Sequence, residues 1–185
     1  MTSSEAAAVA TSTTANASLG LELSARFDYA SASRIVAVRY TLRNSGDTAL
    51  AVFDRGDANS LAAELHKLGA VGIPRMRVEG EDITLEYAVE ALPTDIDITS
   101  PPTPVALELA PGASVDSAFE FLLQGDVAPK RLRLCVSAMR VGDAYMESPV
   151  KTPAGKLWSA SFGVVEKQQR VCSQWYDVAS SAFTA

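Results

Sequence analysis

Apolar and polar residues alternate along most of the chain from Leu19 onward, which is the period-two spacing of half-buried β-strands. The segment 36–43 shows it most clearly, and the turn sequence Asn-Ser-Gly-Asp at 44–47 leads into a returning strand at 48–53. The same alternation recurs in five further stretches: 78–89, 107–121, 132–138, 158–165 and 169–177. About nine short strands separated by turn sequences predict an all-β fold, an antiparallel β-sandwich.

One segment, Ser60–Gly69, breaks this alternation. Leu61, Leu65 and Leu68 are spaced so that they share one face of a helix. Gly69 can take the left-handed backbone conformation that closes a helix. The segment predicts one short helix, about two turns long, whose leucines must pack on a sheet for it to be stable. A strand over part of the segment is the alternative.

The length of 185 residues corresponds to a single folded domain. Residues 1–18 are a low-complexity run rich in Ala, Thr and Ser, and we expect them to form a flexible lead-in. The folded domain is predicted over 19–178, followed by a C-terminal tail over 179–185. Two long irregular stretches, 92–104 and 141–156, are the loops in which a binding function is most expected.

Two segments resemble bacterial immunoglobulin-like β-sandwich domains. Residues 40–47 (YTLRNSGD) are similar to a strand and turn of such domains, and residues 107–121 to their succession of aliphatic strand, Pro-Gly turn and aromatic strand. The resemblance extends over 19–177 and implies an immunoglobulin-like sandwich in an exported or lipid-anchored protein. It departs from the antibody pattern, because the cysteines share a strand face with polar residues and Trp158 lies near the last hairpin instead of in a core strand. It therefore implies no site residues.

The charge balance narrows the possible partners. Sixteen basic and twenty-two acidic side chains give a net charge of −6 at neutral pH. This argues against binding to nucleic acid or to an anionic membrane surface, because both need a basic footprint. No apolar run reaches the length of a transmembrane helix. With one His and two Cys, the chain lacks the residues of a Cys/His zinc module, and no motif predicts a metal or another cofactor.

The chain has a single histidine, His66, and this limits the catalytic devices that it could contain. Any Ser-His-Asp or Cys-His device would have to use it. It lies on the polar side of the predicted helix, beside Lys67, so it is interpreted as an exposed surface residue. No catalytic residues are therefore predicted, and the chain is interpreted as not an enzyme.

Cys135 and Cys172 both lie in predicted strands, on the side that carries polar residues. If they form a disulfide, the bridge is expected on the outer or edge surface, where it staples the C-terminal strand to its neighbour. Such a bridge indicates an oxidising compartment, periplasmic or secreted in a bacterium. Two unpaired thiols in a cytosolic protein are the alternative.

Candidate contacts for a partner lie in the two long loops. Asp95, Asp97 and Pro101 belong to the proline-rich loop, and Tyr145 and Met146 belong to the other. The two aspartates are also groups that Ca²⁺ prefers, but they lack the spacing of a calcium-binding loop. They are interpreted as solvated charge, with a weak cation site as the alternative.

Together these patterns predict a non-catalytic, extracytoplasmic protein-binding module that binds its partner through loops or strand edges. An inhibitor or immunity protein of a lytic enzyme is one version, because an acidic protein complements a basic hydrolase. The alternative is a structural or assembly component of a bacterial envelope complex. The small-residue lead-in also fits a lipid anchor upstream of the chain.

Overall fold

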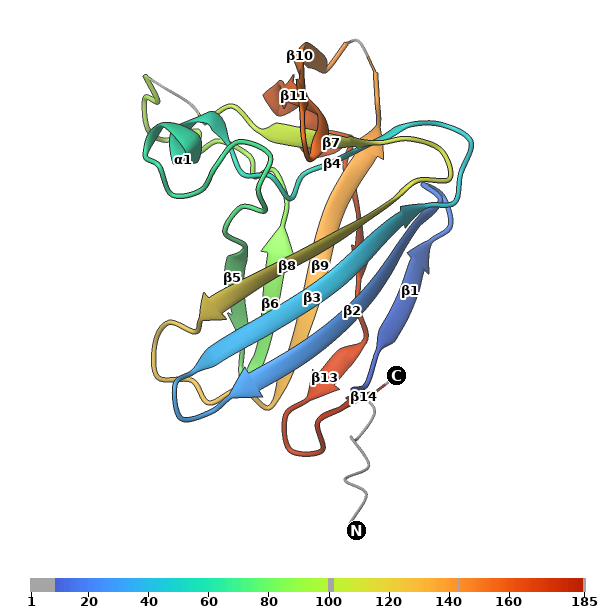
Figure 1. Ribbon diagram of the computed structural model, residues 1–185. Helices are drawn as coiled ribbons and strands as arrows, with labels where there is room; N and C mark the ends of the chain where they lie inside the picture. The colour runs from blue at the N-terminus through green and yellow to red at the C-terminus, as the bar shows by residue number, and fades with distance from the viewer. Residues whose placement is uncertain (1–8, 100–101, 143, 185) are drawn as a thin grey trace.

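The computed structural model describes residues 9–99, 102–142 and 144–184. Within these residues the protein is all-β, as predicted, and its strands form two sheets that face each other (Figure 1). The first sheet has the order β1-β2-β3-β8, with the strands β1 (Ser12–Asn16), β2 (Leu21–Ala30), β3 (Ile35–Asn44) and β8 (Ser114–Leu122). All of its pairs are antiparallel.

The second sheet is larger and has the main order β10-β11-β7-β4-β9-β13-β14. These strands are β10 (Met146–Thr152), β11 (Gly155–Ala160), β7 (Val105–Leu109), β4 (Leu50–Val52), β9 (Arg131–Arg140), β13 (Trp175–Asp177) and β14 (Ala182–Thr184). Three further strands join it beside β9: β5 (Arg75–Glu79), β6 (Asp82–Tyr87) and β12 (Gln169–Cys172). The described strands thus outnumber the expected nine, because several are only three to five residues long.

β9 is the strand around which the second sheet is organised. It pairs with β4 and β6 along one edge and with β12 and β13 along the other. The β6 pair is parallel, so the prediction of a purely antiparallel sandwich is wrong at this point. A parallel pair needs a long crossover, and here the chain runs through β7 and β8 between β6 and β9. Alternation shows which face of a strand is buried but not the direction of its neighbour.

The core lies between the two sheets and joins them into one hydrophobic cluster. The alternation of β3 is confirmed, because Val36, Val38, Tyr40 and Leu42 are buried while Arg39 is exposed. The largest fully buried side chains of this cluster come from both sheets: Leu21, Leu23, Leu42, Leu50, Ile83, Leu85, Leu132 and Leu134. Burial of such aliphatic side chains on both inner faces is what holds the two layers together.

Both ends of the folded domain extend further than the sequence predicted. Residues 1–8 of the expected lead-in lie outside the described residues, but 12–16 form β1, so the prediction of a flexible segment is wrong there. The hydroxyl groups explain this, because Thr14 donates to the carbonyl of Cys172 and Ser12 accepts from the amide of Gln174. At the other end, 182–184 of the expected tail form β14.

The predicted helix is shorter and lies further upstream than the leucine spacing suggested. Helix α1 (Ala58–Ala62) starts at Asp57, whose carboxylate accepts from the amide of Ser60 while the Ser60 hydroxyl bonds back to the Asp57 amide. The chain leaves the helical path at Glu64, which has a φ of 56°. Leu65 and Leu68 are exposed, so the expected packing of a leucine stripe on a sheet is wrong. A second helical segment, η1 (Phe162–Glu166), is a 3₁₀ turn.

The predicted disulfide is confirmed. Cys135 on β9 and Cys172 on β12 lie opposite each other in register, with an S–S distance of 2.03 Å and a Cα–Cα distance of 4.0 Å. The bridge joins neighbouring strands of one sheet, as expected from its position beside polar residues. Cys135 is nevertheless fully buried, beside Glu86 in register on β6, so an outer-surface position is wrong for this residue.

Removal of the disulfide should destabilise the protein markedly. The double substitution Cys135→Ala with Cys172→Ala should lower the free energy of unfolding by about 3–4 kcal/mol, because the unfolded chain regains the freedom of a long loop. Urea unfolding of the oxidised protein, of the reduced protein and of the double variant measures this. Reductant should have no effect on the variant, and an unchanged urea midpoint would contradict the expectation.

The parallel β6/β9 pair carries an ion pair that makes stability depend on pH. The guanidinium of Arg131 donates from Nε to Oδ1 of Asp82 at 2.8 Å and from Nη2 to Oδ2. This contact lowers the pKa of the Asp82 carboxyl below its ordinary value. A carboxyl with a lowered pKa in the folded state contributes stability above its unfolded pKa, and the contribution is lost as the pH falls through the folded pKa.

Asp82→Asn should therefore be less stable than the wild type at neutral pH, and the difference should shrink as the pH falls through the folded pKa of Asp82, where its carboxylate takes up a proton. Urea midpoints measured across this range test the expectation. A difference of the same size at both ends of the range would show that packing, and not charge, is responsible.

Candidate functional site

Two long connections lie together at one end of the molecule, which we call the loop end. They are the connection from β4 to β5, which includes α1, and the connection from β6 to β7 (Figure 1). β10 and β11 lie at the same end. The second connection, residues 88–104, contains the whole proline-rich loop 92–104 that the sequence singled out, and its description is interrupted at 100–101.

A buried ion pair forms the base of the loop end. Directly after β4, Asp54 is fully buried, and its Oδ1 lies 3.1 Å from Nε of Arg55, which is also buried. The N–H of Arg55 does not point along this contact, so the pair is an electrostatic contact without a hydrogen bond between these two atoms. Tyr40 on β3 donates its hydroxyl to Oδ2 of Asp54 at 2.7 Å, and Arg55 donates from Nη2 to the hydroxyl of Ser117 on β8 at 3.0 Å.

Burial dominates the electrostatics of this pair. Removal of the Asp54 carboxylate from water raises its pKa above the ordinary value, against the opposing effects of the Arg55 charge and the Tyr40 hydrogen bond. The same removal from water, together with the Asp54 charge, raises the pKa of the Tyr40 hydroxyl, which stays a donor at any ordinary pH. Asp54, Arg55 and the Tyr40 hydroxyl therefore form a buried polar group at the contact between the two sheets.

The same residues hold the β4–β5 connection in place. Arg55 donates from Nη1 to the carbonyl of Gly69 at 3.3 Å, and the amide of Gly72 donates to the carbonyl of Asp54 at 2.9 Å. Tyr87 on β6 donates its hydroxyl to the carbonyl of Gly72 at 2.8 Å. Asp54 and Arg55, directly after β4, and Tyr87 on β6 thus fix the end of this loop that leads back to the sheet.

His66 is part of this arrangement and is not the exposed residue that the sequence favoured. Its side chain is half-buried, and Nε2 lies 2.9 Å from the carbonyl oxygen of Arg55. Because a carbonyl only accepts, Nε2 is the donor in this contact. The ring rests on Gly56, whose φ of +74° and lack of a side chain leave room for it. His66 therefore closes the loop.

A cleft of about 410 Å³ opens between the two connections. Its walls are mainly apolar and aromatic, and Glu90 and Arg75 stand on its polar side, where they form an ion pair with each other. The apolar lining comes from four parts of the chain and includes Phe53, Ile73, Tyr87, Val89, Ile98 and Phe162. Concave apolar sites of this size with a few polar groups are typical of binding sites.

Four exposed aliphatic side chains lie on the two connections that bound this cleft, and one of them, Ile73, lines it. Leu65 and Ile73 in the first connection and Ile96 in the second are each 61% exposed, and Leu68 is 53% exposed. A lone exposed aliphatic side chain needs no explanation, but several on adjoining loops next to an apolar cleft indicate an interaction surface. We call Leu65, Leu68, Ile73 and Ile96 the loop-end aliphatics.

The predicted site residues divide between this surface and its support. Asp95 and Asp97 are exposed in the second connection, and Pro101 lies outside the described residues. Tyr145 is half-buried and Met146 is buried in a second hydrophobic cluster with Phe53 and Val89, which line the cleft. Met146 therefore packs behind the cleft floor and is not free to contact a partner.

The acidic side chains of the loop end differ in how they are compensated. Glu86 and Glu90 form ion pairs with arginines of β5 and β12. Asp95 and Asp97 have no ion pair or hydrogen bond in the described part of the chain. The charged side chains without an ion pair on these connections thus include Lys67 as well as Glu64, Asp95 and Asp97, and their balance is negative, in line with the net charge of −6.

Comparisons with protein-family models, with curated protein sequences and with solved structures find no match to this chain. Within the residues that the structure describes, no three His, Cys, Asp or Glu side chains are grouped so that they could hold a metal ion. None of the described helices is both long and apolar enough to cross a membrane. The site therefore has to be interpreted from its own geometry.

Two buried tyrosines, Tyr40 and Tyr87, donate to a carboxylate and to a backbone carbonyl respectively, so removal of each hydroxyl compares the two contacts. Tyr40→Phe should lower the free energy of unfolding by about 1–3 kcal/mol, because it leaves an oxygen of a buried carboxylate without its donor. Tyr87→Phe removes a hydroxyl from an uncharged carbonyl and should cost about 1 kcal/mol or less. Urea unfolding of the two variants checks the order, and a larger loss for Tyr87→Phe would contradict the importance of the Asp54 contact.

Proposed function

We propose that this protein is a non-catalytic protein-binding module of an extracytoplasmic compartment, and that it binds its partner at the loop end. The observation that carries the proposal is an apolar cleft between two loops that together expose four aliphatic side chains, one of which, Ile73, lines the cleft. Exposure of this apolar surface to water is unfavourable, and a partner that covers it removes that cost. The cleft accepts an apolar side chain of the partner, and the aliphatics around it exclude water from the contact.

Charge supports a basic partner. Asp95 and Asp97 carry uncompensated negative charge beside the cleft, and the whole chain has a net charge of −6. Complementary charge steers encounter and selects among partners that offer similar apolar contacts. The partner segment is therefore an apolar side chain flanked by Lys or Arg. A basic lytic enzyme of the cell envelope, which this protein would inhibit, fits that description.

The compartment and the finer fold class belong to the same proposal. The disulfide between Cys135 and Cys172 supports an oxidising compartment, such as the periplasm or the exterior of a bacterium. Two facing sheets with long loops at one end also suit an immunoglobulin-like module, a class that uses its end loops for binding. The parallel β6/β9 pair is a departure from that class.

The test compares two surfaces of equal apolar character. Ile73→Glu with Ile96→Glu alters the loop end, while Leu122→Glu alters an aliphatic side chain that is 53% exposed at the end of β8, away from the loop end (Figure 1). Tagged wild type and variants are incubated with an envelope extract, and captured proteins are identified and then titrated as purified proteins. Wild type and Leu122→Glu should bind one basic partner, and the loop-end variant should bind it about tenfold more weakly or worse.

Three results would overturn the proposal. The partner could bind all three proteins equally, or it could be lost from both variants. The wild type could also form a dimer in sedimentation experiments that the loop-end variant abolishes, in which case the cleft would be an interface between two copies. A captured set of envelope-complex subunits that depends on Ile73 and Ile96 would keep the binding surface and favour an assembly role over inhibition.

A further inference from the structure

One edge of the first sheet is a long and regular strand. Within the described part of the chain, β8 pairs with β3 alone, and Figure 1 shows it at the margin of the sheet. It is nine residues long, and its register with β3 runs from end to end without a bulge. A regular edge strand presents a row of unpaired backbone groups, to which another extended chain can add.

The other edge strands of the described residues are short or interrupted. β1, β5, β12 and β14 are three to five residues long. β10 is longer, but its pairing with β11 shifts register between Glu147 and Val150. It also contains Pro149 and Lys151. Proline, lysine and bulges are features with which proteins protect a sheet edge, and β8 contains none of them.

The pairing with β3 shows which backbone groups of β8 face the open edge. Directly after β8, the amide of Leu123 donates to the carbonyl of Arg34. In an antiparallel pair every second residue bonds to the neighbouring strand, so the odd-numbered residues of β8 bond to β3. The even-numbered residues, from 114 to 122, therefore direct their N–H and C=O groups away from β3. Of these groups, the carbonyl of Leu122 accepts from the side-chain amide of Gln124.

The inner side of β8 leaves two aromatic rings partly uncovered. Phe119 and Phe121 pack against the core but are only half-buried, whereas their register partners on β3, Val38 and Val36, are fully buried. The two strands differ in that β3 has a neighbour on each side and β8 does not. A strand added beside β8 covers both rings if it carries apolar side chains at alternate positions.

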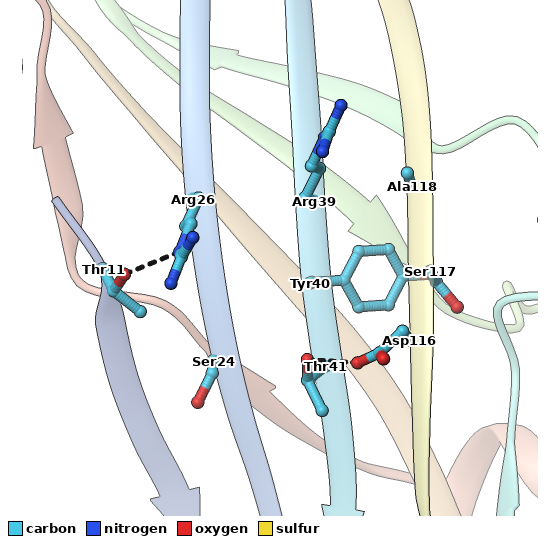
Figure 2. Close-up of a pocket in the computed structure, with 9 residues that line it drawn as sticks. All are labelled: Thr11, Ser24, Arg26, Arg39, Tyr40, Thr41, Asp116, Ser117 and Ala118. Atoms are coloured by element: carbon cyan, nitrogen blue, oxygen red, sulfur yellow. Dashed lines mark hydrogen bonds between the residues drawn. The ribbon is translucent and has the colours of Figure 1, made fainter. Parts of the chain in front are cut away.

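The outer side of β8 carries two exposed carboxylates, Asp116 and Glu120. Asp116 accepts a hydrogen bond from the Thr41 hydroxyl at 2.6 Å (Figure 2), and Glu120 has neither a hydrogen bond nor an ion pair in the described residues. Their register partners on β3 are Thr41 and Ala37, which carry no charge. Lys or Arg at the facing positions of an added strand would complement both carboxylates.

We propose that β8 binds an extended segment of a basic partner as an additional antiparallel strand. The segment has Lys or Arg opposite Asp116 and Glu120 and apolar residues at the positions between. A second copy of this chain does not fit, because full-length pairing of two β8 strands is centred on Ala118. It places Asp116 of one copy opposite Glu120 of the other, and like charges at such positions repel. β8 does not line the loop-end cleft, so this inference does not rest on the proposed function.

The probe is a synthetic peptide, TVKVTVKVT, whose two lysines have the spacing of Asp116 and Glu120. It is titrated into the isotope-labelled protein, and amide chemical shifts and hydrogen exchange are measured. Exchange should slow at residues 116, 118 and 120, whereas residues 117 and 119, whose amides already bond to β3, should change little. The same peptide with glutamate in place of both lysines should bind about tenfold more weakly or worse.

N-methylated peptides separate strand addition from simple attraction between charges. In the proposed pairing, the central Thr of the peptide donates its N–H to β8, while the N–H of the next Val points away from it. N-methylation of this Thr should abolish binding, and N-methylation of this Val should not. In the protein, Ala118→Pro removes one N–H at the open edge and leaves the bonds to β3, so the variant should fold and should bind the unmodified peptide about tenfold more weakly or worse.

A pair of charge variants tests the two carboxylates. Asp116→Asn with Glu120→Gln should weaken binding of the lysine peptide about tenfold. Asp28→Asn is the matched control, because it removes an exposed carboxylate from the same face on β2, and its affinity should equal that of the wild type.

Several results would overturn the proposal. The lysine peptide could fail to bind, both N-methylated peptides could bind equally, or the double variant and Asp28→Asn could lose the same affinity. Shift changes confined to the loop end would place the peptide at the other surface. A dimer of the wild type in sedimentation experiments that Ala118→Pro abolishes would show that a second copy occupies the edge.

Discussion

The buried contact between Asp54 and Arg55 constrains more of this molecule than any other polar interaction in the described residues. Through Tyr40 and Ser117 it is tied to two strands of the first sheet, and through the backbone after β4 it belongs to the second. Breaking one partner of such a pair leaves an uncompensated buried charge, which costs about 3–5 kcal/mol. The two sheets therefore keep one relative position at the loop end, where an apolar core alone would tolerate several.

This constraint explains how an apolar cleft can persist between two loops. If the two loops closed over their exposed aliphatic side chains, burial of this apolar surface would lower the free energy. Here the first loop is held at its base by the bonds of Arg55 to Gly69 and of Tyr87 to Gly72, and His66 holds it from the side. A binding surface that is held open before a partner arrives loses less conformational entropy on binding.

The sequence predicted well what depends on one strand and poorly what depends on its neighbours. The alternation of β3 and the disulfide between Cys135 and Cys172 were predictable, because each follows from the face on which a residue lies. The parallel direction of β6 against β9 was not, because it depends on a crossover through two other strands. Strand β1 was missed for a related reason, since a Ser/Thr-rich segment becomes ordered only when its hydroxyl groups reach a neighbouring backbone.

The candidate site was predicted in outline only. The proline-rich loop drew attention to Asp95 and Asp97, and the exposed position of both agrees with a surface role. The aromatic floor of the cleft was missed because Phe53 and Phe162 are far apart in sequence and resemble ordinary core residues. The sequence contains one indication of the Asp54–Arg55 pair, because two charged residues directly follow a buried strand. Charged residues at such a position are more often found in a turn exposed to solvent.

The two faces of β3 connect the buried ion pair with the outer face of the first sheet. Successive residues of a strand point to opposite sides, so Tyr40 enters the core beside Asp54 while Arg39 is exposed on the outer face. The same holds on β8, where Ser117 accepts from Arg55 and the adjacent Ala118 lies opposite Arg39 on the outer face. The inward residues fix the register and position of these two strands. The outward residues therefore stand on a backbone whose position is set from inside the core.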